Sequence, residues 1–260
     1  MQEYAPSPTN SLHRREPPDA RAAPLVRAGL GVLSALIAVS HAAPARAQSS
    51  GLGGVVALGS QLVDRGMAVT PPGAILQGAG TWSSASGWSA GISASAQLRT
   101  PRRIVETLAQ VAHSWSLSSD WQMQANGLYY HYPRHGRART YDRTEIGVSW
   151  IYRDILTLGL SAAHLHQYGG QRPRGAADVG VRWPLAWQLA FSASAGVAQE
   201  LVPPRGVNYE RRNHYYYGHV GLTWNHGPWR VDVAHIESTR DELSYQPDVS
   251  PWTATVSWTF

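Results

Sequence analysis

The end of this chain constrains its fold more than any other stretch. Residues 252–260 alternate strictly between apolar and hydroxylated side chains, and the last one is aromatic. Because successive side chains of a strand point to opposite faces, the alternation predicts a strand with one apolar and one polar face. A terminal Phe on such a strand is typical of the closing strand of an outer-membrane β-barrel. We therefore interpret Trp258 and Phe260 as an assembly signal.

The first 47 residues predict a secretory signal peptide with an atypical N-terminal extension. An apolar run covers residues 30–39, and Ala45-Arg46-Ala47 has the small-residue spacing of a cleavage site. The run is too short to cross a bilayer as a helix, which needs about 20 apolar residues. We expect residues 1–47 to be removed and residues 48–260 to form one exported domain.

The composition of residues 48–260 favours a membrane protein over a soluble one. They carry 17 Arg and no Lys against 14 acidic residues, without a basic stripe of the kind that predicts nucleic-acid binding. The chain has no Cys, so its stability must come from a source other than disulfides, such as a closed barrel in lipid. Across the whole chain, eleven Trp and twelve Tyr against two Phe suit a membrane–water interface better than a soluble core.

Twelve segments of strand periodicity follow the leader, most of them close to the roughly 9–11 residues that a tilted membrane strand needs. They predict an all-β fold, a transmembrane antiparallel up-and-down β-barrel of about 12 strands. The segments are 52–62, 74–83, 88–98, 107–117, 121–132, 143–152, 155–166, 176–183, 187–198, 214–225, 229–237 and 251–260.

The connections alternate in length, as they do in outer-membrane barrels. Short turns are predicted at 84–87, 118–120, 153–154, 184–186 and 226–228, and long loops at 63–73, 99–106, 133–142, 167–175, 199–213 and 238–250. Trp residues flank the short turns and Tyr residues gather near the long loops, which predicts two aromatic girdles. The alternative is a soluble sandwich or lipocalin-like barrel with its apolar face inward. The Ser, Gln, Thr and Asn of the other face would pack poorly as a core.

Several stretches of the exported part carry a family resemblance. They are residues 55–66, 74–78, 86–91, 128–133 and 221–224, and the best match is an Arg-Gly pair before a loop, followed by a Leu-Gln-Gly strand. The chain resembles a family of bacterial β-barrel proteins of unknown function (Gcw_chp), whose motif falls here on Arg65, Gly66, Gln77 and Gly78. The family usually has an aromatic residue before the Arg, where this chain has Asp64. The resemblance implies an exported barrel and supplies neither a reaction nor a substrate.

Because side chains alternate between the two faces of a strand, the sequence predicts a set of polar residues on the inner wall of the barrel. Two functions are compatible with them: a narrow passive channel for small hydrophilic solutes, or a closed structural or adhesive barrel whose charges pair across the interior. Twelve strands fall between filled barrels of 8 strands and open porins of 16. The predicted lumen-lining residues are Gln122, Gln124, Arg143, Glu145, Asp178, Arg182, Arg230 and Asp232.

The predicted long loops are rich in Arg, which pairs bidentately with phosphate. We therefore expect outer-membrane lipid and lipopolysaccharide as partners, together with the barrel-assembly machinery during biogenesis, and no nucleic acid. The sequence predicts no oligomeric state. The loop arginines are Arg99, Arg102, Arg103, Arg134, Arg137, Arg139, Arg172, Arg174, Arg205, Arg211 and Arg212.

No arrangement in the sequence predicts catalysis, a metal site or a cofactor. A lipid-modifying barrel enzyme would need a Ser beside a His on the outer wall, oriented by a third polar group. His235 and Glu237 share a predicted outward face, but Ser238 falls on the opposite parity. His164 and His166 are the only His-x-His pair and have no nearby carboxylate on their own strand. Phosphate-loop and dinucleotide motifs are absent from the sequence.

Overall fold

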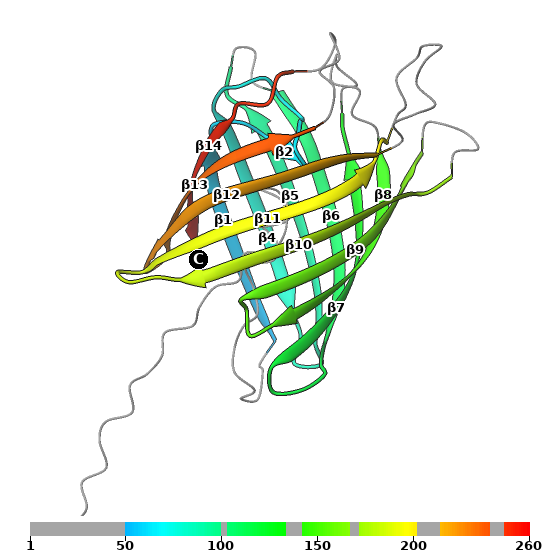
Figure 1. The fold of residues 1–260 in the computed structure, drawn as a ribbon, viewed down its shortest axis with the longest axis vertical. Helices are drawn as coiled ribbons and strands as arrows, with labels where there is room; N and C mark the ends of the chain where they lie inside the picture. Colours follow the sequence, from blue (N-terminus) through cyan, green and yellow to red (C-terminus); the bar gives the residue numbers. More distant parts are fainter. Residues whose placement is uncertain (1–49, 100–102, 134–141, 167–171, 202–213, 240–246) are drawn as a thin grey trace, which may run out of the picture.

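The chain folds into a closed antiparallel β-barrel (Figure 1). The computed structural model describes residues 50–99, 103–133, 142–166, 172–201, 214–239 and 247–260. The predicted signal peptide, residues 1–47, lies outside these ranges. Within them, no helix is both long and apolar enough to cross a membrane.

Twelve strands make the barrel, and each pairs with its neighbours along the sequence until the last returns to the first. The predicted up-and-down barrel of 12 strands is confirmed. The strands are β1 (Gly51–Gly59), β4 (Ile75–Ser83), β5 (Trp88–Gln97), β6 (Arg103–Ser116), β7 (Trp121–His131), β8 (Arg143–Tyr152), β9 (Leu156–Leu165), β10 (Arg174–Pro184), β11 (Leu189–Gln199), β12 (His214–His226), β13 (Trp229–Ser238) and β14 (Trp252–Thr259).

The seam between β1 and β14 closes the barrel through the last residue of the chain. Strand β14 runs antiparallel to β1, with Val55 opposite Thr259. Beyond this pair, the amide of Gly54 donates to the carbonyl of Phe260 at 2.9 Å, and the amide of Phe260 donates to the carbonyl of Gly54 at 3.0 Å. The Phe260 ring lies over Gly54 and stacks on Trp258 with centroids 4.9 Å apart. The terminal Phe is therefore part of the closed hydrogen-bond ring.

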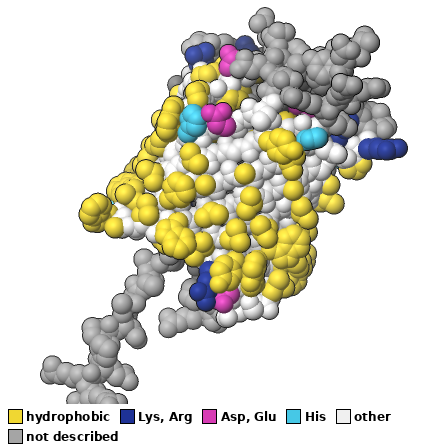
Figure 2. Space-filling view, viewed as in Figure 1, with side chains coloured by type: hydrophobic (Ala, Val, Ile, Leu, Met, Phe, Trp, Pro, Cys, Tyr) yellow, Lys and Arg dark blue, Asp and Glu magenta, His cyan; other side chains and the backbone are white. Residues whose placement is uncertain are grey.

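The strands turn their apolar side chains outward and their polar side chains inward. In β14, Thr253 and Ser257 are buried inside the barrel, whereas Trp252 and Trp258 are exposed on its outer wall. Figure 2 shows apolar side chains over the middle of this wall and charged or His side chains toward its two ends. This is the reverse of a soluble barrel, and it suits a wall that contacts lipid.

Short turns join the strands at one end of the barrel, as predicted. Between β8 and β9, Arg153 and Asp154 both have positive φ, at 47° and 60°, and the Ile155 amide donates to the Tyr152 carbonyl at 2.8 Å. These values fit a two-residue type I′ turn, whose twist matches that of the flanking strands. Trp187, placed at the start of a strand by its periodicity, lies instead in the turn before β11 with φ of 56°.

Strand β6 begins four residues earlier than its periodicity predicted, at Arg103 instead of residue 107. Its register shifts between Ser95 and Ala96 of the facing strand β5, which indicates a bulge. A strict alternation rule cannot continue through such a bulge. The earlier start brings Glu106 into the barrel wall, where it is buried on the inner side.

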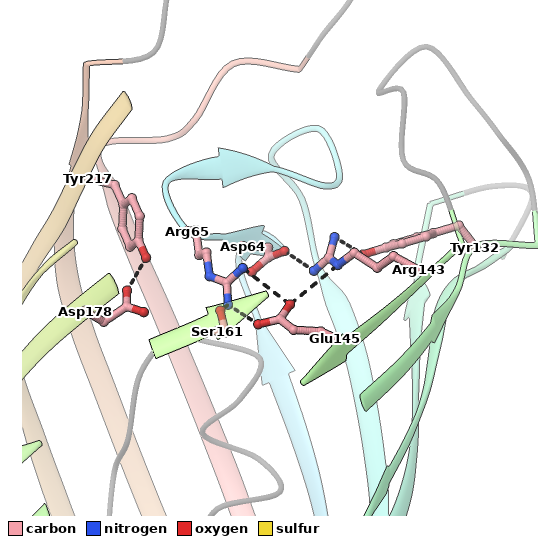
Figure 3. A network of polar contacts seen from close by, with 8 residues as sticks. All are labelled: Asp64, Arg65, Tyr132, Arg143, Glu145, Ser161, Asp178 and Tyr217. Carbon is pink, nitrogen blue, oxygen red and sulfur yellow. Dashed lines mark hydrogen bonds and ion pairs between the residues drawn. The ribbon is translucent and has the colours of Figure 1, made fainter. Parts of the chain in front are cut away.

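Residues 63–73 were predicted as a long loop of the same kind as the other long connections, and this prediction is wrong. This segment includes a small antiparallel hairpin, β2 (Val63–Asp64) and β3 (Met67–Ala68), that forms no part of the barrel sheet. We call residues 60–73 the inner hairpin, because its charged side chains reach the inward residues of the barrel wall (Figure 3). The loop folds inward because its buried apolar residues and charges find partners inside the barrel.

The contact between Gly54 and Phe260 can be tested by adding a side chain to Gly54. A Cβ at this position would lie 2.5 Å from the Phe260 ring. We expect Gly54→Val to lift the ring from the seam and to lower the free energy of unfolding by about 1–2 kcal/mol, the value of lost packing for one side chain. Urea titration of the barrel in lipid, read by its heat-modifiable gel shift, would measure this.

Gly80→Val is the matched control for that variant. Gly80 pairs directly with Gly54 across β1 and β4, and its added Cβ would meet nothing within 4 Å. We expect this control to unfold at the same urea concentration as the wild type. Equal losses in the two variants would contradict the role assigned to Phe260.

Candidate functional site

The inner hairpin has a rigid turn at its tip. Arg65 and Gly66 occupy the two turn positions between β2 and β3, with φ of 47° and 70°. Positive φ at both positions is the pattern of a type I′ hairpin turn. At the stem, the Val69 amide donates to the Leu62 carbonyl at 2.9 Å, and the Gly73 amide donates to the Ser60 carbonyl at 2.7 Å. The Arg65-Gly66 pair thus builds a hairpin tip.

Apolar packing holds one side of the inner hairpin against the wall. Leu62 is fully buried in a cluster with Ile75, Leu108, Tyr130 and Tyr132, which come from strands β4, β6 and β7 and the residue just after β7. Burying one large apolar side chain stabilises a fold by about 1.5–3 kcal/mol. This cluster therefore fixes the hairpin stem on one half of the barrel.

Gln61 fastens the stem to a second part of the chain. Its side-chain nitrogen donates to the carbonyls of Thr70 and Asp248, each at 2.8 Å, and its side-chain oxygen accepts from the Ser250 amide at 2.8 Å. Asp248 and Ser250 precede the closing strand β14. The buried amide of Gln61 thereby joins the hairpin to the segment that leads into the seam.

Four charged side chains form an alternating ion network around the hairpin tip (Figure 3). Asp64 pairs with Arg143, and Arg65 pairs with Glu145. Arg143 and Glu145, two residues apart on β8, also approach each other, with Nε and Oε2 3.8 Å apart. Arg65 donates a further hydrogen bond to Ser161 of β9 at 2.9 Å. Two positive and two negative groups thus neutralise one another inside the barrel.

The network keeps the hairpin charges ionised despite their burial. Burial alone would raise the pKa of Asp64, but Arg143 and Arg65 outweigh it and hold that pKa below its ordinary value. Burial alone would lower the pKa of Arg65, but Glu145 and Asp64 outweigh it and raise that pKa. Breaking a buried pair by removing one partner costs about 3–5 kcal/mol, so the network is a strong anchor.

The tip of the hairpin reaches the opposite wall. A Cβ added at Gly66 would lie 2.8 Å from Cβ of Tyr217 on β12 and 3.0 Å from Cβ of Ser238 on β13. Only a residue without a side chain fits this contact, and the positive φ of Gly66 favours glycine for a second reason. The inner hairpin therefore spans the lumen from the β4–β8 side to the β12–β13 side.

Tyr217 and Asp178 form a hydrogen-bonded pair on the inner wall of the barrel, beside the tip of the inner hairpin. The Tyr217 hydroxyl donates to Asp178 of β10 across strand β11 (Figure 3). The contact passes over Gly196 of β11, where an added Cβ would lie 2.5 Å from Cζ of Tyr217 and 2.6 Å from Asp178. Gly196 therefore leaves room for the Tyr217 ring against the wall.

The inner wall is buried unevenly. Inward side chains on the hairpin side are shielded, among them Ile75, Gln77, Ser95, Glu106 and Leu108, with exposed fractions of 4% or less. Inward residues in the middle of β10 and β11 keep intermediate exposure, namely Asp178, Gly180, Ser192, Ser194 and Gly196, whereas the inward residues Arg182, Ala190 and Ala198 toward the strand ends are buried. The hairpin thus covers one side of the lumen and leaves the middle of β10 and β11 less covered.

The structure distributes the six predicted lumen charges over three places. Arg143 and Glu145 belong to the ion network, and Asp178 accepts from Tyr217. The other three lie nearer the short-turn end, where Arg230 bonds to Asp232 and Arg182 lies opposite Ser192 of β11. The two predicted lumen glutamines, Gln122 and Gln124, are half-buried. The side chain of Gln124 donates to the Ser114 hydroxyl at 3.3 Å.

Two contributors to the site were missed by the sequence interpretation. Asp64 was noted only as a departure from the family motif, and Glu106 lay outside the predicted strand. The available signal was Gly66, since glycine favours the positive φ that the second position of a two-residue hairpin turn requires. Of the other residues that carry the resemblance, Gln77 donates to Ser95 at 3.4 Å inside the barrel, and an added Cβ at Gly78 would meet nothing within 4 Å.

The exterior carries the His residues considered as candidate catalytic groups. His235 contacts Glu237 at 2.8 Å and its ring lies 4.9 Å from that of Trp252. Ser238 lies beside the hairpin tip on the inner side, so it cannot act on the outer wall with His235. Across the described part of the chain, no group of three or more His, Asp or Glu is placed to hold a metal ion.

The loop arginines are described only in part. Arg99, Arg103 and Arg172 are exposed, and Arg174 is half-buried at the start of β10. The remaining ones lie outside the described residues: Arg102, Arg134, Arg137, Arg139, Arg205, Arg211 and Arg212.

No family model and no curated protein matches the sequence. Among solved structures, the KdgM porin is similar at 9% identity and a TM-score of 0.49, covering 80% of this chain and 98% of its own. The NanC porin is similar at 11% identity and a TM-score of 0.48, covering 79% and 98%. OprD from Pseudomonas aeruginosa is similar at 10% identity and a TM-score of 0.37, covering 74% and 61%. At these values no solute and no residue role transfers to this chain.

The ion network predicts that the hairpin tip loosens when Arg65 is neutralised. The chain has no Cys, so Met67→Cys on β3 supplies a single thiol reporter. We expect Arg65→Met in this background to raise the rate of thiol labelling at least about tenfold, because local opening becomes less costly. Gly66→Ala should act in the same direction by pushing the tip from Tyr217. Arg153→Met, at an exposed turn, is the control, and equal labelling in all variants would contradict the anchor.

The lowered pKa of Asp64 predicts a pH window for its contribution. A carboxylate with a depressed folded-state pKa stabilises the fold above its unfolded-state pKa, and the stabilisation is lost as the pH falls through the folded-state value. We expect the difference in Tm between wild type and Asp64→Asn to stay constant from about pH 7 to 5 and to shrink below about pH 4. Thermal melts in lipid would measure this, and a difference that grows on acidification would contradict it.

Proposed function

We propose that this chain is a passive channel of the outer membrane for small hydrophilic solutes. The observation that supports the proposal is the uneven burial of the inner wall. The inner hairpin shields residues on its own side, whereas Asp178, Ser194 and their inward neighbours in the middle of β10 and β11 keep partial exposure. A polar strip of this kind, beside an ordered constriction, fits a narrow aqueous path.

The outer surface supports the proposed location. Apolar side chains cover the middle of the barrel wall on the face shown in Figure 2. Exposed Trp residues flank the short turns, among them Trp82, Trp88, Trp183 and Trp229. An apolar band with aromatic borders matches the lipid-facing surface of outer-membrane barrels. Membrane lipid and lipopolysaccharide are therefore the proposed surroundings, and the barrel-assembly machinery is the proposed partner during insertion, with Trp258 and Phe260 as its signal.

The inner hairpin would set the width and chemistry of the path. Arg65 offers one partly exposed guanidinium beside the path, and Asp178 with Tyr217 faces it from the far wall (Figure 3). Polar groups on both sides favour hydrated solutes over apolar ones. Gly196 keeps the Tyr217 ring against the wall and so contributes to the width.

A closed structural barrel is the second candidate, and one observation favours it. The hairpin tip touches β12 and β13 at Gly66 while its stem packs on β4, β6 and β7, so the hairpin crosses the whole lumen. A barrel closed in this way would act through its envelope position or its outer loops. Ion conductance separates the two candidates directly.

Single-channel recording in planar bilayers tests the proposed channel. We expect a small, stable conductance from the wild type and a larger one when the hairpin is loosened by Arg65→Met. We expect Gly196→Ala to lower the conductance, because the added Cβ forces the Tyr217 ring away from the wall into the path.

Gly180→Ala is the matched control for Gly196→Ala. Gly180 is an inward glycine of the neighbouring strand β10, and its added Cβ would meet only a carbonyl oxygen at 4.0 Å. Its conductance should equal that of the wild type. Wild-type protein that folds into lipid but passes no current above the bare bilayer would overturn the channel and support the closed barrel.

A further inference from the structure

We propose that the turn between β10 and β11 is a lipid anchor, an apolar tip that inserts beside the barrel into the lipid leaflet at the short-turn end. The turn comprises residues 183–189, with the sequence Trp-Pro-Leu-Ala-Trp-Gln-Leu, and we call these residues the anchor turn. The inference rests on the proposed position of the barrel in a membrane, but it does not require the barrel to conduct.

The anchor turn stands out from the side of the barrel. Figure 1 shows the end of β10 and β11 as the leftmost of the coloured strands, and Figure 2 shows apolar side chains over the same region. Pairing of β10 with β9 ends at Val181, opposite Leu156. Pairing with β11 continues to Pro184, opposite Ala190. At about 3.3 Å per residue, the hairpin therefore extends about 10 Å beyond the last pair that β10 forms with β9.

The side chains of the anchor turn are apolar and uncharged. Trp183, Leu185 and Trp187 are exposed, and Trp187 is the most exposed of them at 87%. Residues 183–199 include no Asp, Glu, Lys, Arg or His. The other four short turns, at 84–87, 118–120, 153–154 and 226–228, consist of Ser, Asp, Arg, His, Ala, Gly and Pro. The anchor turn is thus the short turn that lipid can cover without receiving a charge.

The backbone of the projecting strand also suits lipid. The Arg182 amide donates to the Ile155 carbonyl at 2.7 Å, which is the last contact on the β9 side that this strand makes with its amides. Because amides of a strand point alternately to its two sides, the next position on that side is Pro184. Proline has no N–H, so the donor that would lack a partner there is missing. An unpaired donor would be costly in lipid, which accepts no hydrogen bonds.

A strained backbone presents the indole of Trp187 at the tip. Trp187 and Gln188 have φ of 56° and 65°, and the Leu189 amide donates to the Ala186 carbonyl at 3.2 Å. These are the two central positions of a type I′ turn, which favour Asn and Gly. A bulky residue in this conformation costs conformational free energy, and such strain points to a function of the residue that carries it.

The turn is held in place from the neighbouring strand. The Asn225 amide donates to the Gln188 carbonyl at 3.1 Å, and the Gln188 side chain hydrogen-bonds to Nδ1 of His226 at 3.0 Å. These two contacts account for the conformation of Gln188, but they leave the ring of Trp187 exposed. Contact of this ring with lipid would offset the strain.

The anchor turn continues the surface that faces lipid. Val179, Val181 and Phe191 are exposed on the outer face of β10 and β11 and lead directly to Trp183. An indole has an apolar body and one N–H donor, a combination that favours the boundary between acyl chains and headgroups. This continuity assigns the tip to the same lipid that covers the wall.

Fluorescence quenching in vesicles of phosphatidylethanolamine and phosphatidylglycerol tests the anchor. The chain has no Cys, so Ala186→Cys supplies a single thiol in the anchor turn for the fluorophore NBD. Ser119→Cys, at an exposed position of the β6–β7 turn, is the matched control. We expect a nitroxide on the lipid acyl chains to quench the label at residue 186 at least about threefold more strongly than the label at residue 119, and aqueous iodide to quench in the opposite order.

Trp187→Asn in the Ala186→Cys background separates lipid contact from turn structure. Asn favours the positive φ of this position, so the heat-modifiable gel shift should match that of the parent. We expect the label to become at least about threefold more accessible to iodide, because the aromatic side chain that holds the tip in lipid is gone. Trp187→Phe should stay close to the parent, since it keeps an aromatic ring.

Equal quenching at residues 186 and 119, or an unchanged label in Trp187→Asn, would overturn the anchor. Protection of residue 186 that increases with the ratio of protein to lipid would assign the turn to a contact between two copies, and would overturn the anchor as well. Wild-type conductance with a water-exposed turn would remove the anchor and leave the channel standing, whereas a lipid-covered turn without conductance would do the reverse.

Discussion

The fold depends on the requirement that every backbone amide and carbonyl of a lipid-embedded sheet find a partner. Lipid supplies no hydrogen bonds, so a sheet that crosses a bilayer must close on itself. Here β1 pairs with β14, and the backbone of Phe260 adds two hydrogen bonds to Gly54 at the end of that seam. The outward apolar side chains and inward polar side chains follow from the same closure, because each strand then has one face toward lipid and one toward the lumen.

The inner hairpin forms a charged constriction inside the closed barrel. Its apolar stem alone would hold it against one wall, through Leu62 and the cluster around it. The ion network then fixes its tip, since Asp64 and Arg65 find Arg143 and Glu145 of β8 in register. Each charge needs its partner, because an unpaired charge inside the barrel would carry the full free-energy cost of desolvation.

The sequence predicted the barrel well because its signal is periodic and repeated. The alternation of apolar and polar residues, as from Trp252 to Phe260, predicted the number and order of the strands and which face of each strand points outward. Most predicted strand boundaries agree with the structure within two residues. The inner hairpin escaped prediction because a loop has no period, and whether it folds inward depends on charges that lie about 80 residues away on β8. Parity placed Arg143 and Glu145 on the inner side, but it could not reveal that their partners are in a loop. Glu106 escaped because the strand was predicted to begin one residue later, and the bulge next to Glu106 breaks the alternation that would have extended the strand.

The points at which the inner hairpin is attached have a mechanical consequence. Its stem packs on strands on one side of the β1–β14 seam, while Gln61 holds the segment that leads into β14 and Gly66 touches β12 and β13 on the other side. The hairpin is therefore an internal brace across the one junction that joins the two ends of the sheet. A barrel that widened its lumen by displacing this brace would also weaken its own closure, so the width of the path and the stiffness of the wall are coupled.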